Sequence, residues 1–296
     1  MTLAIETHNL TKKYDGFSAL NGLTMRVPTG GIVGFLGRNG SGKTTTIKIL
    51  LDIARRTSGD VSVLGEPTSS VSVRRRIGFL GEDKRLYAYM KVKEIIAFTR
   101  PLFPKWSVET EHSLLREFDL PLERNVTALS KGMRTKLGLL LNLSRHPELL
   151  ILDEPSEGLD PVMSEQMLQL LVRQASDGTT VFFSSHQISE VERIADHVIA
   201  IDKGRVVLEG QVDHLRNDYR RITFVFDNPP APDVFKGYAV EQVEIIGRTV
   251  SILASSDADE IAAQGSLLGA KSVEVQPMGL RELFLEKVRG SSHAAL

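Results

Sequence analysis

A glycine-rich segment at residues 37–44 has the residue types and spacing needed to bind phosphate groups. It fits the pattern G-x-x-x-x-G-K-[ST] between an apolar run at 32–36 and a helical pattern at 44–54, a context that argues against a chance glycine-rich turn. Its backbone N–H groups and the helix N-terminus would face the phosphates. We expect Lys43 to neutralise the terminal phosphates and the Thr44 hydroxyl to bind Mg²⁺. The residues assigned to phosphate binding are Gly37, Arg38, Asn39, Gly40, Ser41, Gly42, Lys43, Thr44 and Thr45.

Two acids follow a second apolar run, at residues 149–152. A strand buried on both faces has this pattern, and it would deliver Asp153 toward Mg²⁺. The adjacent Glu154 could orient and deprotonate an attacking water molecule. Taken alone, the pair is equally consistent with an ordinary strand-to-loop boundary. Beside the phosphate loop, it indicates a nucleoside triphosphatase.

The elements that must position these residues alternate along the first two thirds of the chain. Short β-branched runs and helical patterns indicate an α/β domain at residues 1–215, with strands covered by helices. Within it, a charge-rich helical pattern predicts a helical subdomain at about 86–146. Asp160 followed by Pro161 predicts the start of a helix, and residues 198–208 predict a β-hairpin.

The pattern changes after this domain, and residues 216–296 predict a small α+β accessory domain. A strand pair is expected at 240–254. Asp257 and Glu260 resemble a capping box at the start of a helix. The tail at 290–296 is expected to be disordered.

Composition excludes several classes of function. The chain has 296 residues and 42% hydrophobic content, enough for a large core. It contains no cysteine, which excludes disulfides, a thiol nucleophile and Cys-ligated metals. The net charge of −1 gives no reason to expect a nucleic-acid partner. Neither a signal-peptide pattern nor a run of about 18 apolar residues is present, so we expect no membrane span.

Further segments resemble the motifs of the ABC ATPases. Residues 129–133, L-S-K-G-M, are similar to the LSGGQ signature. Residues 184–186, S-S-H, resemble the switch-histidine segment, and 156–160 resemble the D-loop. Tyr14 stands where the family places an aromatic ring that stacks on adenine. The resemblance covers about residues 3–215, in the family's order and near its spacings.

This resemblance implies a P-loop NTPase fold of the ABC ATPase type, with a helical subdomain and the small C-terminal α+β domain beside it. It further implies a head-to-tail dimer that binds two ATP molecules with Mg²⁺, each between one phosphate loop and the other subunit's signature. Catalysis would then fall to Lys43, Glu154 and His186. Beyond the phosphate loop, the implied nucleotide-binding residues are Tyr14, Glu82, Ser130, Gly132, Asp153 and Asp160, and the implied metal-binding residues are Thr44, Glu82 and Asp153.

Two departures from the family pattern are present. Lys131 and Met133 replace a glycine and the glutamine of the signature, while Ser130 and Gly132 are kept. In the segment that aligns with the Q-loop, Glu82 replaces the usual glutamine. Acidic Q-loops and small C-terminal domains resemble the bacterial ABC-2 type export branch, which favours export over import.

The family resemblance implies a separate transmembrane permease as partner, with the ATPase held on the cytoplasmic face of the cell membrane. The ATPase subunits would form a homodimer, although a heterodimer stays open. Leu86, Tyr87 and Met90 fall where the family receives the permease, and core packing is an equal interpretation for each. The alternative function is a soluble ABC clamp for DNA repair or translation. The single phosphate loop and the near-neutral charge argue against that alternative, and intact Glu154 and His186 argue against a non-hydrolysing regulator.

Overall fold

The computed structural model describes residues 2–83 and 86–293. The chain divides into two compact units, Met1–Glu209 and Gly210–Leu296. This division precedes the expected boundary after residue 215. The reason is that helix α8 (Val212–Asp218) contacts α10 (Leu280–His293) and so belongs to the second unit.

A six-stranded sheet forms the centre of the first unit. Its strand order is β10-β9-β3-β8-β7-β6, and β3 pairs in parallel with both β8 and β9, as β7 does with β8 and β6. The predicted hairpin is confirmed by β9 and β10, which are neighbours in the sheet. The strands are β3 (Ile32–Gly37), β6 (Ile77–Leu80), β7 (Leu149–Asp153), β8 (Thr180–Ser185), β9 (His197–Asp202) and β10 (Arg205–Gln211).

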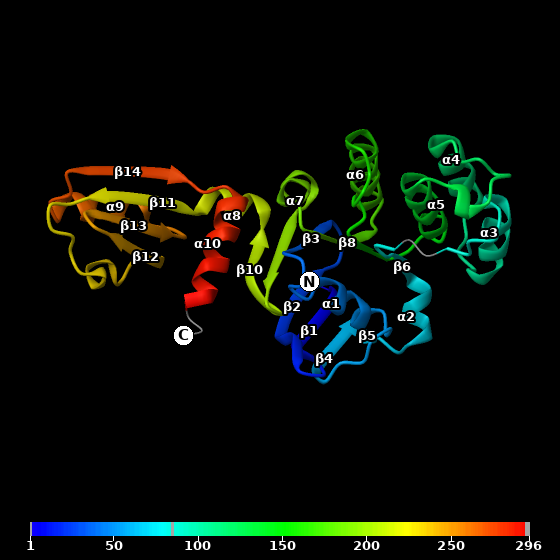
Figure 1. The fold of residues 1–296 in the computed structure, drawn as a ribbon, viewed down its shortest axis with the longest axis horizontal. Helices are drawn as coiled ribbons and strands as arrows, with labels where there is room; N and C mark the ends of the chain where they lie inside the picture. Colours follow the sequence, from blue (N-terminus) through cyan, green and yellow to red (C-terminus); the bar gives the residue numbers. More distant parts are fainter. Residues whose placement is uncertain (1, 84–85, 294–296) are drawn as a thin grey trace. The chain divides into compact units, whose positions relative to one another are not determined.

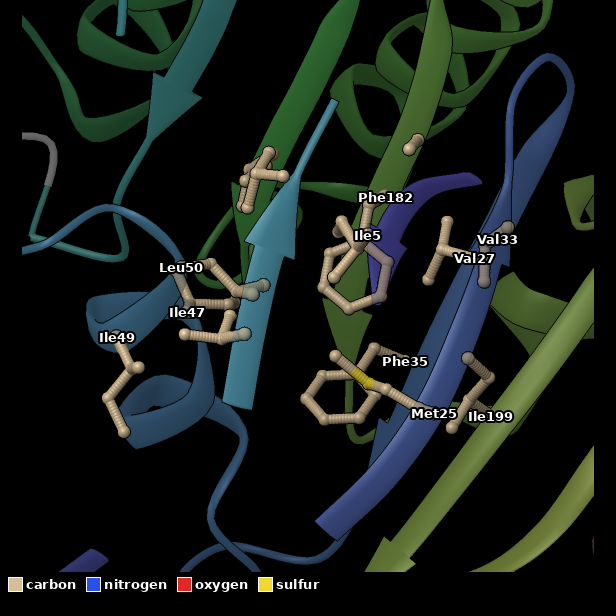
Figure 2. Close-up of a cluster of buried hydrophobic side chains, with 14 of the residues drawn as sticks. Ile5, Met25, Val27, Val33, Phe35, Ile47, Ile49, Leu50, Phe182 and Ile199 are labelled. Carbon is tan, nitrogen blue, oxygen red and sulfur yellow. The ribbon is translucent and has the colours of Figure 1, made fainter. Parts of the chain in front are cut away.

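An antiparallel sheet packs against this parallel sheet, and its strand order is β2-β1-β4-β5. Figure 2 shows Ile5, Met25 and Val27 of this sheet in one buried cluster with Phe35 and Phe182 of the parallel sheet. The Phe35 and Phe182 ring centroids are 5.1 Å apart. Burial of such side chains is the main source of stability. The strands are β1 (Leu3–Tyr14), β2 (Phe17–Pro28), β4 (Ser58–Val63) and β5 (Glu66–Pro67).

Four helices accompany these sheets: α1 (Lys43–Leu50), α2 (Val71–Arg76), α6 (Pro161–Ser176) and α7 (Ile188–Ile194). The expected N-terminus of α6 is confirmed, because the Asp160 side chain accepts a hydrogen bond from the Met163 N–H at 2.9 Å. The expected helix to residue 54 was too long. α1 ends at Leu50 because Asp52 adopts a positive φ of 57°, and the Ile53 N–H turns back to donate to the Lys48 carbonyl.

The predicted helical subdomain is a group of helices next to edge strand β6 (Figure 1). Within it, α5 contacts α3, α4 and β6. Both polar atoms of the Asn142 side-chain amide bond to the backbone of Phe79. Oδ1 accepts from the Phe79 N–H and Nδ2 donates to the Phe79 carbonyl, each at 2.9 Å. α5 is thereby hydrogen-bonded to the sheet edge. The elements are α3 (Val92–Thr99), the 3₁₀ turn Arg100–Leu102, α4 (Val108–Phe118), the 3₁₀ turn Val126–Ala128 and α5 (Lys131–Leu143).

The second unit is an antiparallel four-stranded sheet, in the order β12-β13-β11-β14, with its own core. Phe224, Phe226 and Phe235 are buried in that core. A Cβ on Gly265 of α9 would lie 2.0 Å from the Phe224 ring, so the glycine lets α9 approach the sheet closely. The elements besides α8 and α10 are β11 (Arg220–Val225), the 3₁₀ turn Pro232–Phe235, β12 (Val240–Ile246), β13 (Thr249–Ala254), α9 (Ala258–Leu267) and β14 (Ser272–Pro277).

Two expectations for this unit were wrong. Asp257 makes no capping box, because its backbone is left-handed, with φ 58°, and its carboxylate instead accepts from the Ala239 N–H. The expected disorder from residue 290 is replaced by helix α10, which continues to His293; residues 294–296 lie outside the described residues. Across the described ranges, no helix combines the length and the apolar character that crossing a bilayer requires.

Candidate active site

The carboxyl ends of four parallel strands bring the predicted phosphate-binding, metal-binding and catalytic residues to one edge of the sheet. β3 runs into the phosphate loop, β7 ends at Asp153, β8 leads to His186 and β6 leads to Glu82. Ligands in open α/β sheets bind outside this edge. A hollow of about 340 Å³ lies here. It is lined by Phe17, Ala19, Arg38, Asn39, Gly40, Gly42, Lys43, Thr44, Thr45, Glu82, Glu154, Glu157 and His186.

The phosphate loop is held open by its glycines. Gly42 precedes α1 with φ 112°, and a Cβ there would lie 2.8 Å from the Ala19 carbonyl oxygen. Gly40 has φ 80° and open space where a Cβ would point. Ser41 is 4% exposed, and its Oγ has no hydrogen-bond partner among the described residues. An open backbone cradle with an unused buried hydroxyl at a helix N-terminus fits phosphate oxygens.

Two acids at the end of β7 are held by one serine of β8. The Ser184 Oγ donates to Asp153 Oδ1 at 2.7 Å and accepts from the Glu154 N–H at 3.0 Å. The Glu154 backbone has φ 46°, in the left-handed region that non-glycine residues rarely adopt. This bend lets consecutive carboxylates serve one site from a single strand end. Both side chains are buried.

Glu154 joins the two other predicted catalytic residues. Its Oε1 lies 3.1 Å from Lys43 Nζ, and its Oε2 lies 2.8 Å from His186 Nδ1. Lys43 Nζ also donates to the Gly37 carbonyl at 2.6 Å. The structure therefore brings Lys43, Glu154 and His186 into one connected group, although they are far apart in the sequence.

Further acids surround this group. Burial raises the pKa of Asp153, and hydrogen bonds from Ser184 and Thr44 oppose that rise. Glu82 is largely exposed, but partial desolvation of its carboxyl group raises its pKa, and a hydrogen bond with Glu157 raises it further. The carboxylates of Asp153 and Glu82 are therefore less stable as anions than they would be in water, and a bound cation would stabilise them.

The donor set fits Mg²⁺ together with a nucleotide. Mg²⁺ prefers oxygen ligands and is usually held by one or two carboxylates plus phosphate oxygens and water. The Thr44 hydroxyl and the Asp153 carboxylate form a hydrogen-bonded oxygen pair. Both residues, together with Glu82, line a second hollow of about 420 Å³, and Thr44 and Glu82 also line the first. Within residues 2–83 and 86–293, no three His, Cys, Asp or Glu side chains form a metal cage by themselves. These oxygens suit an ion shared with phosphates.

The predicted signature residues lie elsewhere on the first unit. Ser130 is exposed at the N-terminus of α5, and its Oγ accepts from the Met133 N–H at 3.1 Å. Gly132 lines a separate hollow of about 130 Å³, and a Cβ there would lie 2.3 Å from the Met163 side chain. Lys131 lies against Gly158 of the D-loop segment. The Asp160 carboxylate is used as the cap of α6.

Sequence reasoning missed three residues at the hollow. Phe17 and Ala19 line it from β2, and Phe17 faces Tyr14 across the hairpin register. Tyr14 is 47% exposed, with Lys12 Nζ 4.6 Å from its ring centroid. Glu157 also lines the hollow. An aromatic three residues beyond Tyr14, and an acid beside the D-loop glycine, were the available signals.

Comparisons with known proteins agree with this architecture. A family model described as "ABC transporter" matches residues 20–157. The bacitracin transport ATP-binding protein BcrA of Bacillus licheniformis is 37% identical over 226 residues, which are 75% of this chain and 74% of that protein. The ABC transporter ATP-binding protein YtrB of Bacillus subtilis is 27% identical over 291 residues, 97% of this chain and 98% of that protein.

A solved structure, described as that of the ATP-binding subunit of an ABC transporter, matches with a TM-score of 0.66 at 30% identity. The match covers 73% of this chain and 92% of that chain. The predicted fold class and the predicted ATPase class are confirmed by these comparisons. The chain belongs to the ABC transporter family, as one of its ATP-binding, ATP-hydrolysing subunits.

Proposed function

We propose that this subunit hydrolyses ATP with Mg²⁺ at the hollow and thereby drives export through a separate transmembrane permease. One observation carries the proposal: Glu154 contacts both Lys43 and His186 beside the open phosphate loop. Phosphoryl transfer depends on positioning and charge neutralisation more than on covalent chemistry. Glu154 and His186 can provide the positioning, and Lys43 can provide the charge neutralisation.

Each residue then has a distinct role. Lys43 and the backbone N–H groups of the loop hold the phosphates, while Thr44 and Asp153 hold Mg²⁺. Mg²⁺, when bound, neutralises charge on the phosphate oxygens. Glu154 orients the attacking water and takes its proton. His186, 2.8 Å from Glu154, keeps the water and the terminal phosphate aligned.

The signature residues complete the site in a second subunit. Ser130 and the N-terminus of α5, a helix of 13 residues, are exposed on the surface, where they can meet another chain's nucleotide. We therefore propose a head-to-tail dimer, with Ser130, Gly132 and Asp160 acting in trans and an aromatic ring at Tyr14 or Phe17 against adenine.

The permease would dock beside the helical subdomain. A hollow of about 420 Å³ lies there between the sheet edge and α5, and Thr44 and Asp153 of the proposed Mg²⁺ site also line it. Its lining includes apolar Ile53, Phe79 and Leu86 beside charged Lys48 and Glu82. Exposed Tyr87 follows directly in the chain. Such a mixed groove suits an amphipathic helix of a membrane partner, which would place the subunit on the cytoplasmic face of the membrane.

Export is supported by similarity alone. BcrA of B. licheniformis is named for bacitracin transport, and SrtF of Streptococcus pyogenes, which is 34% identical over 215 residues, is named for lantibiotic transport. Cargo similar to bacitracin or to a lantibiotic is the corresponding proposal for this chain.

The test is affinity purification of tagged Glu154→Gln protein from detergent-solubilised membranes with ATP, beside Lys43→Ala as the matched control. We expect a polytopic membrane protein to co-purify in stoichiometric amount with the Glu154→Gln subunit. Recovery of ribosomes or DNA-repair proteins in its place would overturn the transporter role in favour of a soluble clamp.

A further inference from the structure

Ser184 stands between the two acids of the site, and neither the motif pattern nor the family resemblance assigned it a role. It is completely buried at the carboxyl end of β8, where β8 pairs in parallel with β7. In this register Ser184 lies directly beside Asp153. A polar side chain with no exposure is retained only where its hydrogen bonds are made.

The hydroxyl of Ser184 makes two hydrogen bonds of opposite direction. A hydroxyl carries one hydrogen, and Ser184 donates it to Asp153 Oδ1 at 2.7 Å. Its oxygen accepts from the backbone N–H of Glu154 at 3.0 Å. One atom therefore fixes the Asp153 carboxylate and the peptide that carries Glu154 relative to each other.

The peptide at Glu154 needs such a restraint. Its φ of 46° lies in a region that L-residues with side chains rarely occupy, and such conformations persist where surrounding contacts hold them. Relaxation of this bend would turn the Glu154 carboxylate away from Lys43 and His186. A displacement of about 1 Å at a catalytic group can cost roughly 10²-fold in rate.

The neighbouring serine shows that the arrangement belongs to Ser184 itself. Ser185 is equally buried, but its hydroxyl donates to Glu190 of α7 at 2.8 Å. Alternate side chains of a strand point to opposite faces. Of these two serines, Ser184 is the one with contacts to both acids.

We propose that Ser184 is a positioning residue of the ATPase site, whose hydroxyl locks Asp153 and the bent Glu154 peptide into the geometry that turnover requires. The inference rests on the roles proposed above for Asp153 and Glu154. It predicts that catalysis and Mg²⁺ binding depend on this hydroxyl, while Mg²⁺-free nucleotide binding does not.

The experiment compares Ser184→Ala with Ser184→Thr, which keeps a hydroxyl, in the full-length chain. For Ser184→Ala we expect kcat to fall about 10- to 100-fold, the range seen when groups that orient metal ligands are removed. The Mg²⁺ concentration that half-saturates binding of a fluorescent ADP analogue should rise about tenfold. Binding of the same analogue in EDTA should match wild type. Ser184→Thr should recover kcat to within about threefold of wild type, because a hydroxyl can restore both hydrogen bonds.

Thr180→Val is the matched control. Thr180 is also buried in β8, and its hydroxyl also accepts a backbone N–H, that of Gly30 at 2.9 Å, but it lies at the far end of the strand. Its loss should leave kcat and the Mg²⁺ titration unchanged. Wild-type kcat and Mg²⁺ dependence in a folded Ser184→Ala protein, or equal losses in Ser184→Ala and Ser184→Thr, would overturn the proposal.

Two further variants separate the possible failures. If Ser184→Ala does not fold by circular dichroism, Ser184→Cys, with a weaker donor of similar size, carries the same expectation at reduced magnitude. Glu154→Gln is assayed in parallel: full turnover in that variant would reject the role of Glu154, and hence the premise, independently of Ser184.

Discussion

The two sides of the proposed nucleotide site, the phosphate loop and the signature segment, are built in opposite ways. On the phosphate-loop side, Lys43, Asp153 and Glu154 are buried and linked to one another or to Ser184. On the signature side, Ser130 is exposed and its hydroxyl caps its own helix. The first half is preorganised within one chain, whereas the second offers a helix N-terminus at the surface. In the proposed dimer, the chemistry and its dependence on assembly would therefore lie in different regions of the chain.

The largest expected effect tests the preorganised half. Glu154→Gln keeps the size of the side chain but removes its basicity, so the turnover rate should fall about 10²- to 10⁴-fold. ATP affinity should be kept, and gel filtration with ATP should show an accumulated dimer. Glu148→Gln, at the opposite end of β7, is the control and should hydrolyse ATP normally. Normal hydrolysis by Glu154→Gln would show that another group is the base.

The exposed half is tested by mixing two inactive proteins. Lys43→Ala damages the phosphate loop, and Ser130→Ala damages the signature. In a head-to-tail heterodimer of the two, one site carries both defects and the other carries neither. With random exchange of subunits, the mixture should regain up to about a quarter of wild-type turnover, as expected of a twofold-symmetric interface.

Each variant alone should stay inactive at the same total concentration, which is the control for this mixture. Absence of any recovery, with heterodimers detected by cross-linking, would mean that Ser130 acts within its own chain and that the signature side does not complete the partner's site.

The sequence predicted the motifs of the preorganised side better than the contacts and strands that hold them in place. The phosphate loop and the acid pair are contiguous motifs, and hence visible in one sequence, as is the helix N-terminus at Asp160. The role of Ser184 could not be predicted from the sequence, because its hydrogen-bond partners lie at the end of another strand. The β1–β2 pairing escaped detection for a different reason: register shifts around Asn9, which has φ 50°, interrupt the alternation of apolar residues.

Asn142 connects the two halves, because it joins the signature helix α5 to the strand that leads to Glu82. Asn142→Leu would leave the Phe79 N–H and carbonyl without these partners in a partly buried position. We expect a loss of about 2–4 kcal/mol in the free energy of unfolding, measured by urea denaturation. Gln169→Leu, which removes an exposed amide from α6, should change it by no more than about 0.5 kcal/mol. An equal loss in the free energy of unfolding in both variants would show that the hydrogen bonds of Asn142 to Phe79 add no particular stability.

The smallest expected effect concerns Glu82, which lines the hollow beside the phosphate loop. Its side chain is largely exposed, but partial desolvation of the carboxyl group, and then a hydrogen bond with Glu157, raise its pKa above the ordinary value of 4.5. At neutral pH, the ionised Glu82 carboxylate has a higher free energy in the folded chain than in the unfolded chain, which lowers stability. Glu82→Gln removes this charge and should therefore raise the melting temperature. The gain should be at most about 2 °C, since the residue is largely exposed.

The sign of this effect can be checked by pH. As the pH falls through the raised pKa of Glu82 toward 4.5, the folded carboxyl takes up its proton and the penalty disappears. The difference in melting temperature between Glu82→Gln and wild type should therefore shrink on acidification. A melting temperature of Glu82→Gln below that of wild type at neutral pH, with the deficit disappearing on acidification, would mean that Glu82 is stabilised as a carboxylate. The charge of Glu82 would then stabilise the folded chain and not destabilise it.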